Sequence, residues 1–284
     1  MKSFCIKSNN LEIINYLLNN IKNSNFDNIY ISQNKFKNFN NVIIHYTGED
    51  FCTFYNVLSD IITELIIFFY EPTLLKQIIN LNFFYFDTLE KNDILKIALD
   101  LISNDNNKDF NNRKENIYIS TLKYITENKS MILDGFVNFR LKEYFKTLDS
   151  CIDLAVNKFL IEREYLEFID LLKLYINSKE SKEPVLHLIY SRNNTILINE
   201  QKNIISINDN IFNAKYLSDI TFCENDYILN SLLTLVPQKL FIHVIDKPID
   251  DFINTLQMIF AGRTFICEDC PICMAYNIDK TIHL

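Results

Sequence analysis

The hydrophobic periodicity of this chain changes twice, and these two changes constrain its fold more than any other feature. Strand-like and helix-like patterns alternate over residues 1–49. Over residues 50–180 apolar residues instead recur at three- and four-residue steps, which is typical of amphipathic helices. Beyond Pro184 short strand patterns return, separated by helical stretches. We therefore predict an α+β fold in which a central helical bundle, 50–180, is flanked by αβ units at 1–49 and 181–284.

Each of the first two segments has its own succession of patterns. Residues 1–49 contain SFCIKS, LEIINYLLNNI, NIYIS and NVIIHY in that order, which predicts a β-α-β-β unit. The clearest pattern of the middle segment is DGFVNFRLKEYFKTLDSCIDLAVNKF, residues 134–159, whose apolar residues form one stripe and predict a single long helix. We interpret such stripes as core between packed helices rather than as the lining of a ligand pocket.

The C-terminal segment predicts a β-hairpin followed by a β-α-β unit. VLHLIYS and TILINE flank the turn-forming Arg192, Asn193 and Asn194. KLFIHVI and RTFIC then have the character of strands on either side of the helical stretch DDFINTLQMIF. Neighbouring strands joined by such a helix are parallel, so we expect their C-terminal ends, which carry His243 and Cys267, to lie at one edge of the sheet.

Composition argues against several classes of function. The three glycines lie far apart in the sequence, so the chain cannot form the glycine-rich loops that hold phosphates or dinucleotides. The net charge of −8 argues against a broad nucleic-acid-binding surface. HExxH and GxSxG motifs are absent, and we interpret the isolated His45 and His187 as packing residues of strands. We therefore recognise no catalytic constellation and expect no nucleic-acid partner.

Two stretches bear on the location of the protein. The N-terminal sequence MKSFCIKSNN has only a short apolar run, closed by Lys7, and so lacks the apolar region of a secretory signal. The most apolar stretch, VLSDIITELIIFFY at 57–70, contains Asp60 and Glu64 and is shorter than the ~20 apolar residues that span a bilayer. We interpret it as a buried helix. We therefore predict a cytoplasmic protein with no membrane span, whose thiols are reduced or bind metal.

The stretch CEDCPIC places Cys267, Cys270 and Cys273 at an even spacing. Three interpretations stay open: a zinc or iron–sulfur site, unreactive reduced thiols, or a redox pair with one additional thiol. The spacing matches part of a ferredoxin motif, but Asn277 stands where the fourth cysteine would be, which weakens the iron–sulfur interpretation. Because Pro271 favours a tight turn, we predict that the three sulfurs face one small volume. A metal would take its fourth ligand from His243, His283 or Cys223.

Three segments, in this order, resemble the YtxC-like family of sporulation proteins: GFVNFRLKEY, LLTLVPQKLFIHV and IFAGRTFICEDCPIC. The resemblance covers about half of the chain, from the predicted long helix to the cysteine motif. It implies a role connected with sporulation and a family pattern that includes Cys267, Cys270 and Cys273. It implies no particular reaction.

Two functional hypotheses follow. In the first, the chain is a non-enzymatic cytoplasmic protein that acts by binding a partner protein, with the helical segment as the contact surface. In the second, it binds a metal or senses redox state through the C-terminal cysteines. The missing catalytic constellation favours the first hypothesis, and the cysteine motif alone carries the second.

Overall fold

The computed structural model describes residues 1–24, 27–103, 108–192, 195–205, 223–267 and 269–278. Contacts divide the chain into two compact units, Met1–Glu162 and Arg163–Leu284. Helix α7, Lys142–Asn177, contributes its first part to the N-terminal unit and its last part to the C-terminal unit. The fold is α+β, as predicted, because both units combine helices with a mixed sheet.

The N-terminal unit contains a four-stranded sheet in the order β2-β3-β1-β4. Its strands are β1 (Lys2–Ser8), β2 (Ile29–Phe36), β3 (Phe39–Tyr46) and β4 (Ser130–Ile132). β3 pairs antiparallel with both β1 and β2, and helix α1, Leu11–Asn23, follows β1. The Asn10 side chain caps α1 by accepting a hydrogen bond from the Glu12 N–H at 2.8 Å. This arrangement confirms the predicted β-α-β-β order of residues 1–49.

β4 was not expected from the sequence. It pairs parallel with β1, so that Met131 lies opposite Ile6 and is fully buried. A three-residue strand has no recognisable period of its own, and only its partner β1 makes it a strand. The predicted helix over 134–159 is also interrupted, because α6 (Leu133–Arg140) ends before Leu141 and α7 begins at Lys142.

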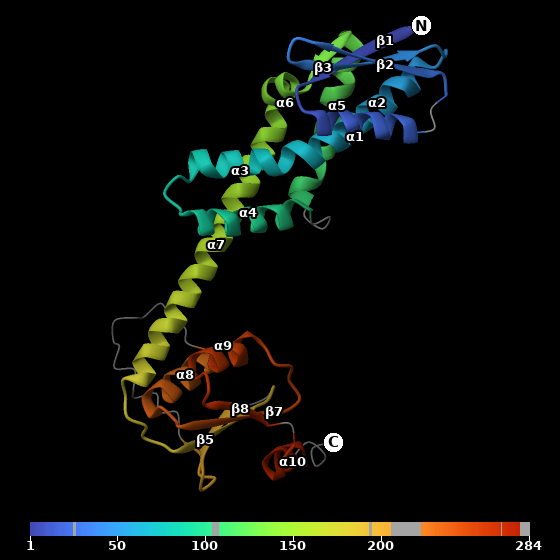
Figure 1. Cartoon of the computed structure of the whole chain (residues 1–284). Helices are drawn as coiled ribbons and strands as arrows, with labels where there is room; N and C mark the ends of the chain where they lie inside the picture. The colour runs from blue at the N-terminus through green and yellow to red at the C-terminus, as the bar shows by residue number, and fades with distance from the viewer. Residues whose placement is uncertain (25–26, 104–107, 193–194, 206–222, 268, 279–284) are drawn as a thin grey trace. The chain divides into compact units, whose positions relative to one another are not determined.

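The remaining helices of this unit follow one another along the chain. They are α2 (Phe51–Leu65), the π-helical turn η1 (Ile66–Tyr70), α3 (Glu71–Asn82), α4 (Thr88–Ser103) and α5 (Lys108–Glu127). Pro72 lies in the first turn of α3, directly after the π-helical turn η1, and its missing N–H interrupts the hydrogen-bond pattern of the helical run at this point. Figure 1 shows α1 on one side of the strands, and α1 contacts both β1 and β3.

One hydrophobic core joins the sheet and the helices of the N-terminal unit. It includes Phe4 and Ile6 of the sheet together with Ile62 and Leu148 of the helices. The predicted boundaries after residues 49 and 180 lie where the secondary structure changes, whereas the contacts divide the chain after Glu162. As a statement about separate domains, the three-part division stays a prediction.

The C-terminal unit contains a second sheet in the order β6-β5-β7-β8. Its elements are β5 (Val185–Tyr190), β6 (Thr195–Asn199), α8 (Glu224–Leu235), β7 (Lys239–Val244), α9 (Asp251–Ile259), β8 (Thr264–Cys267) and α10 (Pro271–Ile278). β5 and β6 form the predicted antiparallel pair, although Asn193 and Asn194 of the predicted turn lie outside the described residues. β7 and β8 pair in parallel, which confirms the predicted β-α-β unit.

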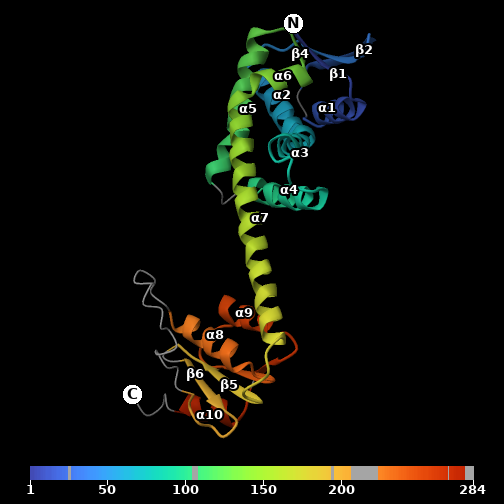
Figure 2. The ribbon, with the colours of Figure 1, turned by 90° about the vertical axis from the view of Figure 1, so that its left-hand side faces the viewer.

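Helices cover both faces of this second sheet. Leu186, Leu188 and Leu240 on one face share a core with α8, α9 and the end of α7. Ile189, Ile198 and Ile245 form a smaller cluster with Ile272 and Tyr276 of α10. Figures 1 and 2 accordingly show α8 and α9 on one side of the strands and α10 on the other. The helix α10 thus packs on the sheet face that also carries the predicted metal ligands.

One helical run is long and apolar enough, by length and composition alone, to cross a membrane. It is Phe51–Asn82, with 32 residues and a mean hydropathy of 1.5, and 39% of its most apolar stretch is buried within the structure. Phe54, Ile62 and Leu75 of this run lie in the core of the N-terminal unit. The helix extends well beyond the apolar stretch at 57–70, so length does not exclude a span. The expected absence of a membrane span therefore stays a prediction.

Candidate metal centre

The three cysteines of the CEDCPIC stretch lie at the end of β8 and at the start of α10, and their sulfurs converge. Cys267 is the last residue of β8, Cys270 directly precedes α10, and Cys273 lies in the first turn of α10. His243 lies on β7 directly opposite Cys267 in the parallel pairing. The parallel β-α-β unit therefore brings the histidine and the first cysteine together at one edge, as the sequence predicts.

The ligand atoms of these four residues all lie within 4.8 Å of one another. The sulfur of Cys273 is 3.7 Å from that of Cys270 and 3.8 Å from that of Cys267. Nδ1 of His243 is 3.2 Å from the Cys273 sulfur and 3.5 Å from the Cys270 sulfur. The prediction that the three sulfurs face one small volume is confirmed.

These distances match the edges of a coordination tetrahedron. With Zn–S bonds of about 2.3 Å, two thiolates on a tetrahedral zinc ion lie about 3.8 Å apart. A Zn–N bond of about 2.0–2.1 Å brings an imidazole nitrogen slightly closer to the sulfurs. The four separations given above therefore fit one ion shared by three sulfurs and one nitrogen, and the other two ligand pairs lie within 4.8 Å.

Local backbone geometry holds Cys270 and Cys273 together. The first turn of α10 begins at Pro271, whose fixed φ and missing N–H suit the first helical position. The Met274 N–H donates to the Cys270 carbonyl at 2.9 Å, and the Cys273 N–H donates to the Cys270 sulfur at 3.4 Å. Residues at this spacing face the same side of a helix, so the turn aims both sulfurs at the centre.

The surroundings also set the protonation of the ligands. Desolvation, followed by the neighbouring His187, lowers the pKa of His243 to about 4, so this imidazole is neutral at pH 7. Desolvation and then hydrogen bonds with Cys270 and Cys273 raise the pKa of Cys267 to about 12. Desolvation also acts on Cys270, but hydrogen bonds from the Cys273 N–H and the other thiols outweigh it and lower the pKa of Cys270. Cys270 is therefore the most acidic of the three thiols, since the pKa of Cys273 is raised as well.

His187 orients the histidine of the cluster, a role that the sequence interpretation missed. Its Nδ1 lies 3.0 Å from Nε2 of His243, and the two rings stack with centroids 5.2 Å apart. If Nδ1 of His243 binds a cation, its proton lies on Nε2 and is donated to Nδ1 of His187. His187 also stacks on Phe241 at 5.2 Å, which fixes its ring. The interpretation of His187 as a simple packing residue is thus incomplete.

The other candidates are placed elsewhere. Cys223 is exposed at the N-cap of α8 and does not belong to the cluster. His283 lies outside the described residues. His45 lies between the hydroxyls of Ser3 and Ser32, at 2.8 Å and 3.2 Å, and so has the packing role expected for it.

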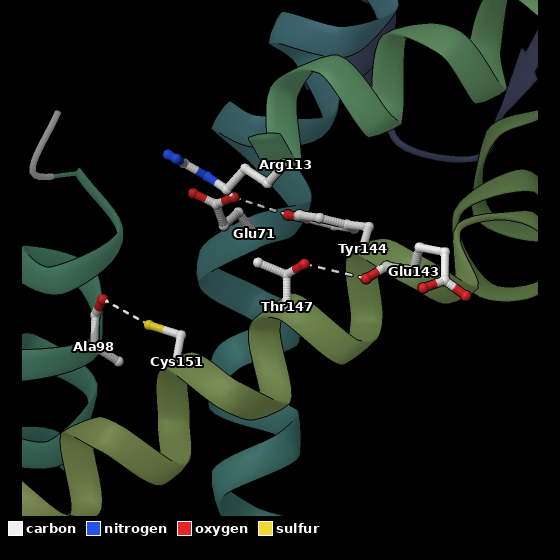
Figure 3. Close-up of polar contacts among 7 residues, drawn as sticks. All are labelled: Glu71, Ala98, Arg113, Glu143, Tyr144, Thr147 and Cys151. Carbon is white, nitrogen blue, oxygen red and sulfur yellow. Dashed lines mark hydrogen bonds and ion pairs between the residues drawn. The ribbon is translucent and has the colours of Figure 1, made fainter. Parts of the chain in front are cut away.

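A second polar cluster lies in the helices of the N-terminal unit (Figure 3). Glu71 is only 4% exposed, and one of its carboxylate oxygens accepts from Arg113 Nε at 3.1 Å and from the Tyr144 hydroxyl at 3.0 Å. Desolvation and then the charge of Glu71 raise the pKa of Tyr144. These residues lie on α3, α5 and α7, and no sequence pattern connects them. The negative charge of Glu71 is thus paired with the positive charge of Arg113, and the contacts connect three packed helices.

Cys151, shown beside this cluster in Figure 3, is an unreactive thiol. It is fully buried and donates to the Ala98 carbonyl at 3.4 Å. Desolvation, followed by the charge of Glu71, raises its pKa to about 11. The nearby charge of Arg113 lowers this pKa, but burial and Glu71 outweigh it, so the thiol stays protonated at pH 7.

Comparison with known proteins bears on the whole chain. A family model described as the YtxC-like family matches residues 56–264, more than half of the sequence. This chain belongs to the YtxC-like family. A curated relative, "Uncharacterized protein YtxC" of Bacillus subtilis (strain 168), is 22% identical over 155 residues, which are 53% of each protein. The match thus spans about half of the length of that relative. No solved structure gives a significant match.

The family match includes His243 but ends before Cys267. The resemblance of the sequence to this family is therefore confirmed, while the cysteine pattern expected for the family stays a prediction.

Proposed function

We propose that the C-terminal unit binds one zinc ion through the sulfurs of Cys267, Cys270 and Cys273 and through Nδ1 of His243. The observation that supports this proposal most strongly is the convergence of these four ligand atoms within 4.8 Å. Thiolate and imidazole ligands in a tetrahedral arrangement are the preferred surroundings of Zn²⁺. The low pKa of His243 adds support, because a neutral imidazole is the form that binds metal.

Zinc accounts for the spacing better than the alternatives. In a [4Fe–4S] cluster each cysteine binds a separate iron, so the sulfurs stand wider apart than the 3.7 Å and 3.8 Å found here. In a [2Fe–2S] cluster only two cysteines share one iron, so it does not account for a sulfur of Cys273 that is close to two others. A redox pair needs only two thiols, and it leaves the third sulfur and the imidazole of His243 without a role. A single ion uses all four groups.

We propose that the ion is structural rather than catalytic. Four protein ligands complete a tetrahedron, whereas catalytic zinc sites keep one position for water or substrate. The ion would join α10 to the edges of β7 and β8, next to the apolar contacts of Ile272 and Tyr276 with the sheet. A helix as short as α10 is marginal in water without tertiary contacts. Metal binding would supply much of the stability that α10 needs.

At the level of the cell, we propose a cytoplasmic sporulation protein that acts by binding a partner protein without turnover of a small substrate. Membership in the YtxC-like family and the resemblance to sporulation proteins support this role. The absence of phosphate loops and nucleophile motifs from the sequence supports a non-enzymatic action. Deletion of the gene is expected to impair spore formation, and variants that alter exposed apolar patches of the helices should fail to restore it.

The metal proposal is tested on protein purified under reducing, anaerobic conditions. We expect about one zinc per chain by elemental analysis, and intense tetrahedral absorption bands after replacement by Co²⁺. Cys270→Ser should lose the metal, while Cys223→Ser, an exposed cysteine of the same unit, should keep it. Iron together with acid-labile sulfide would instead establish a cluster. No metal after exposure to zinc would refute a metal site.

A further inference from the structure

Two adjoining hollows lie on the N-terminal unit, at the face of the sheet that is turned away from α1. One has a volume of about 630 Å³ and is lined by residues of β1, β2 and β3. The other, of about 580 Å³, is lined by β4, α5 and α6. Lys7 and Ile132 line both hollows, so the two hollows adjoin, and we refer to them together as the groove.

The charge of this groove is opposite to that of the chain as a whole. Its lining includes Lys7, Lys35, Lys37 and Arg140 and contains no Asp or Glu. The whole chain has 36 acidic against 28 basic residues. Within the described part of the chain, Lys7, Lys35 and Arg140 form no ion pair, and Lys37 lies over the ring of Phe36 at 5.7 Å. The four cations are therefore not neutralised by the protein itself.

Exposed apolar side chains line the same groove. Phe36 is 66% exposed, Phe139 is 75% exposed and Ile132 is 44% exposed, and all three line the groove. Exposed aromatic side chains near unpaired cations are typical of protein-binding surfaces, in which aromatic residues and arginine contribute most of the affinity. Neither these three apolar side chains nor the cations belong to the hydrophobic core of the N-terminal unit.

We propose that this groove binds an acidic segment of a partner protein, one in which carboxylates alternate with apolar side chains. Carboxylates of the segment would pair with Lys7, Lys35 and Arg140, and its apolar side chains would cover Phe36, Phe139 and Ile132. This inference names the chemistry of the partner, and it rests on the proposal that the protein acts through a protein partner. It does not depend on the metal centre.

The charge distribution favours a peptide over a nucleic acid as the occupant. At physiological ionic strength, charges separated by more than about 8 Å are largely screened, so a short acidic segment interacts mainly with the cations of the groove. A nucleic-acid strand carries a phosphate at every nucleotide and would extend beyond the groove along a protein whose net charge is −8. A partner segment with a few carboxylates avoids that repulsion.

The test uses the purified full chain and fluorescence anisotropy. The probes are a labelled peptide of alternating glutamate, phenylalanine and serine, its counterpart with glutamine in place of glutamate, and a labelled oligothymidylate. The groove variant is Lys35→Glu with Arg140→Glu, and the control is Lys76→Glu with Lys158→Glu, which makes the same change of charge at exposed residues of the same unit. Thermal unfolding of each variant verifies that it is folded.

We expect the acidic peptide to bind more tightly than its glutamine counterpart and than oligothymidylate. The groove variant should raise the Kd of the acidic peptide about tenfold or more, since each change replaces an attraction with a repulsion, and the control should leave it within about twofold. Equal effects of groove and control variants, or tighter binding of oligothymidylate, would overturn the proposal. Loss of peptide binding with an intact sporulation phenotype in the groove variant would refute this inference and leave the proposed sporulation role standing.

Discussion

Glu71 in the N-terminal unit and Cys273 in the C-terminal unit are both buried polar residues, with exposed fractions of 4% and 5%, but their surroundings differ in charge. Glu71 contacts a cation, Arg113, and a hydroxyl donor, Tyr144. Cys273 contacts two further thiols and an imidazole nitrogen, all of which can donate lone pairs to a metal. The first cluster is complete within the protein, whereas the second gains a positive partner only when a cation binds.

This difference determines whether the stability of each unit depends on a bound ligand. A buried charge that is already paired and hydrogen-bonded needs no ligand, but removal of one partner leaves the other with an uncompensated desolvation cost. A group of converging ligand atoms gains its stability from the ion, so binding energy and folding energy are linked. We therefore expect the two units to respond oppositely to removal of metal and to substitution of charge.

The largest effect should follow removal of the metal. Zinc contributes apparent binding energies of about 10–16 kcal/mol to zinc-finger peptides, and we expect a chelator or Cys270→Ser to lower the free energy of unfolding of the C-terminal unit by about 5 kcal/mol or more. Amide hydrogen exchange should show α10 losing protection first, with the N-terminal unit unchanged. Cys223→Ser, which keeps a good N-cap residue on α8, serves as the control. An unchanged C-terminal unit in the presence of chelator would contradict a structural metal.

The next largest effect concerns the cluster that needs no ligand. Arg113→Met leaves the Glu71 carboxylate buried without its cation, and such a loss costs about 3–5 kcal/mol of the free energy of unfolding. The double variant Glu71→Gln with Arg113→Met should recover part of this loss, because no charge is then buried alone. Urea unfolding of each variant measures both values.

The control for this prediction is an exposed ion pair of the same unit. Lys96 Nζ lies 2.8 Å from Asp93, but both side chains are more than half exposed. Lys96→Met should change the free energy of unfolding by about 0.5 kcal/mol or less. If Arg113→Met had no larger effect than Lys96→Met, burial of Glu71 would not be what makes its cluster important.

A smaller effect should distinguish His187 from the metal ligands. His187→Phe keeps a ring that can stack on Phe241 but removes the acceptor for Nε2 of His243. Loss of such a supporting hydrogen bond lowers metal affinity by about 10–100-fold, and we expect the lower end of this range because the four ligands remain. Competition with a chromophoric chelator measures the affinity. His187→Gln, which keeps an acceptor, should restore part of it, and equal affinities for the wild type and His187→Phe would refute the positioning role.

The sequence predicted the C-terminal site well because its residues belong to one β-α-β unit. The strand pattern of residues 239–245, the helix after it and the strand ending at Cys267 determine a parallel pair, and a parallel pair brings His243 next to Cys267. His187 could not be predicted in the same way. It reaches His243 because β5 is the other neighbour of β7, and strand order between a hairpin and a β-α-β unit is not specified by local patterns.

The N-terminal unit shows the limits of local patterns more clearly. Glu71, Arg113 and Tyr144 lie on three helices and are brought together only by helix packing. The interruption at Leu141 went unpredicted because its apolar stripe continues across the break, and hydrophobic period does not record a local change of backbone angles. A continuous apolar stripe therefore predicts burial more reliably than it predicts an unbroken helix.

The smallest effect concerns Asp250, a partly exposed carboxylate that we compare with the buried Glu71, and this effect depends on pH. Asp250 caps α9 by accepting from the Ile253 N–H at 3.2 Å, and it accepts from the Tyr190 hydroxyl at 2.5 Å. Desolvation raises the pKa of Asp250, but the hydrogen bond from Tyr190, the backbone hydrogen bond and the charge of Lys247 outweigh it, so the pKa lies below its ordinary value. Because the pKa is lower in the folded state, the carboxylate stabilises the fold above the ordinary value of about 3.9, and this contribution is lost as the pH falls through the folded pKa.

We expect Asp250→Asn to lower the free energy of unfolding of the C-terminal unit by about 1 kcal/mol at pH 7, because asparagine keeps the helix cap but loses the charged acceptor. The side chain is 37% exposed, which is why the effect should be well below that of Arg113→Met. Urea unfolding compares the two proteins at each pH from 7 to 3, because protonation of the cysteines releases zinc from both proteins alike at low pH. The difference between them should narrow below about pH 4, where the wild-type carboxyl becomes neutral as well. Asp170→Asn, at an exposed pair with Lys173, should cost about 0.5 kcal/mol or less at pH 7. A difference for Asp250→Asn that stayed constant over the whole pH range would show that the loss comes from packing, and that the charge of this carboxylate does not stabilise the unit.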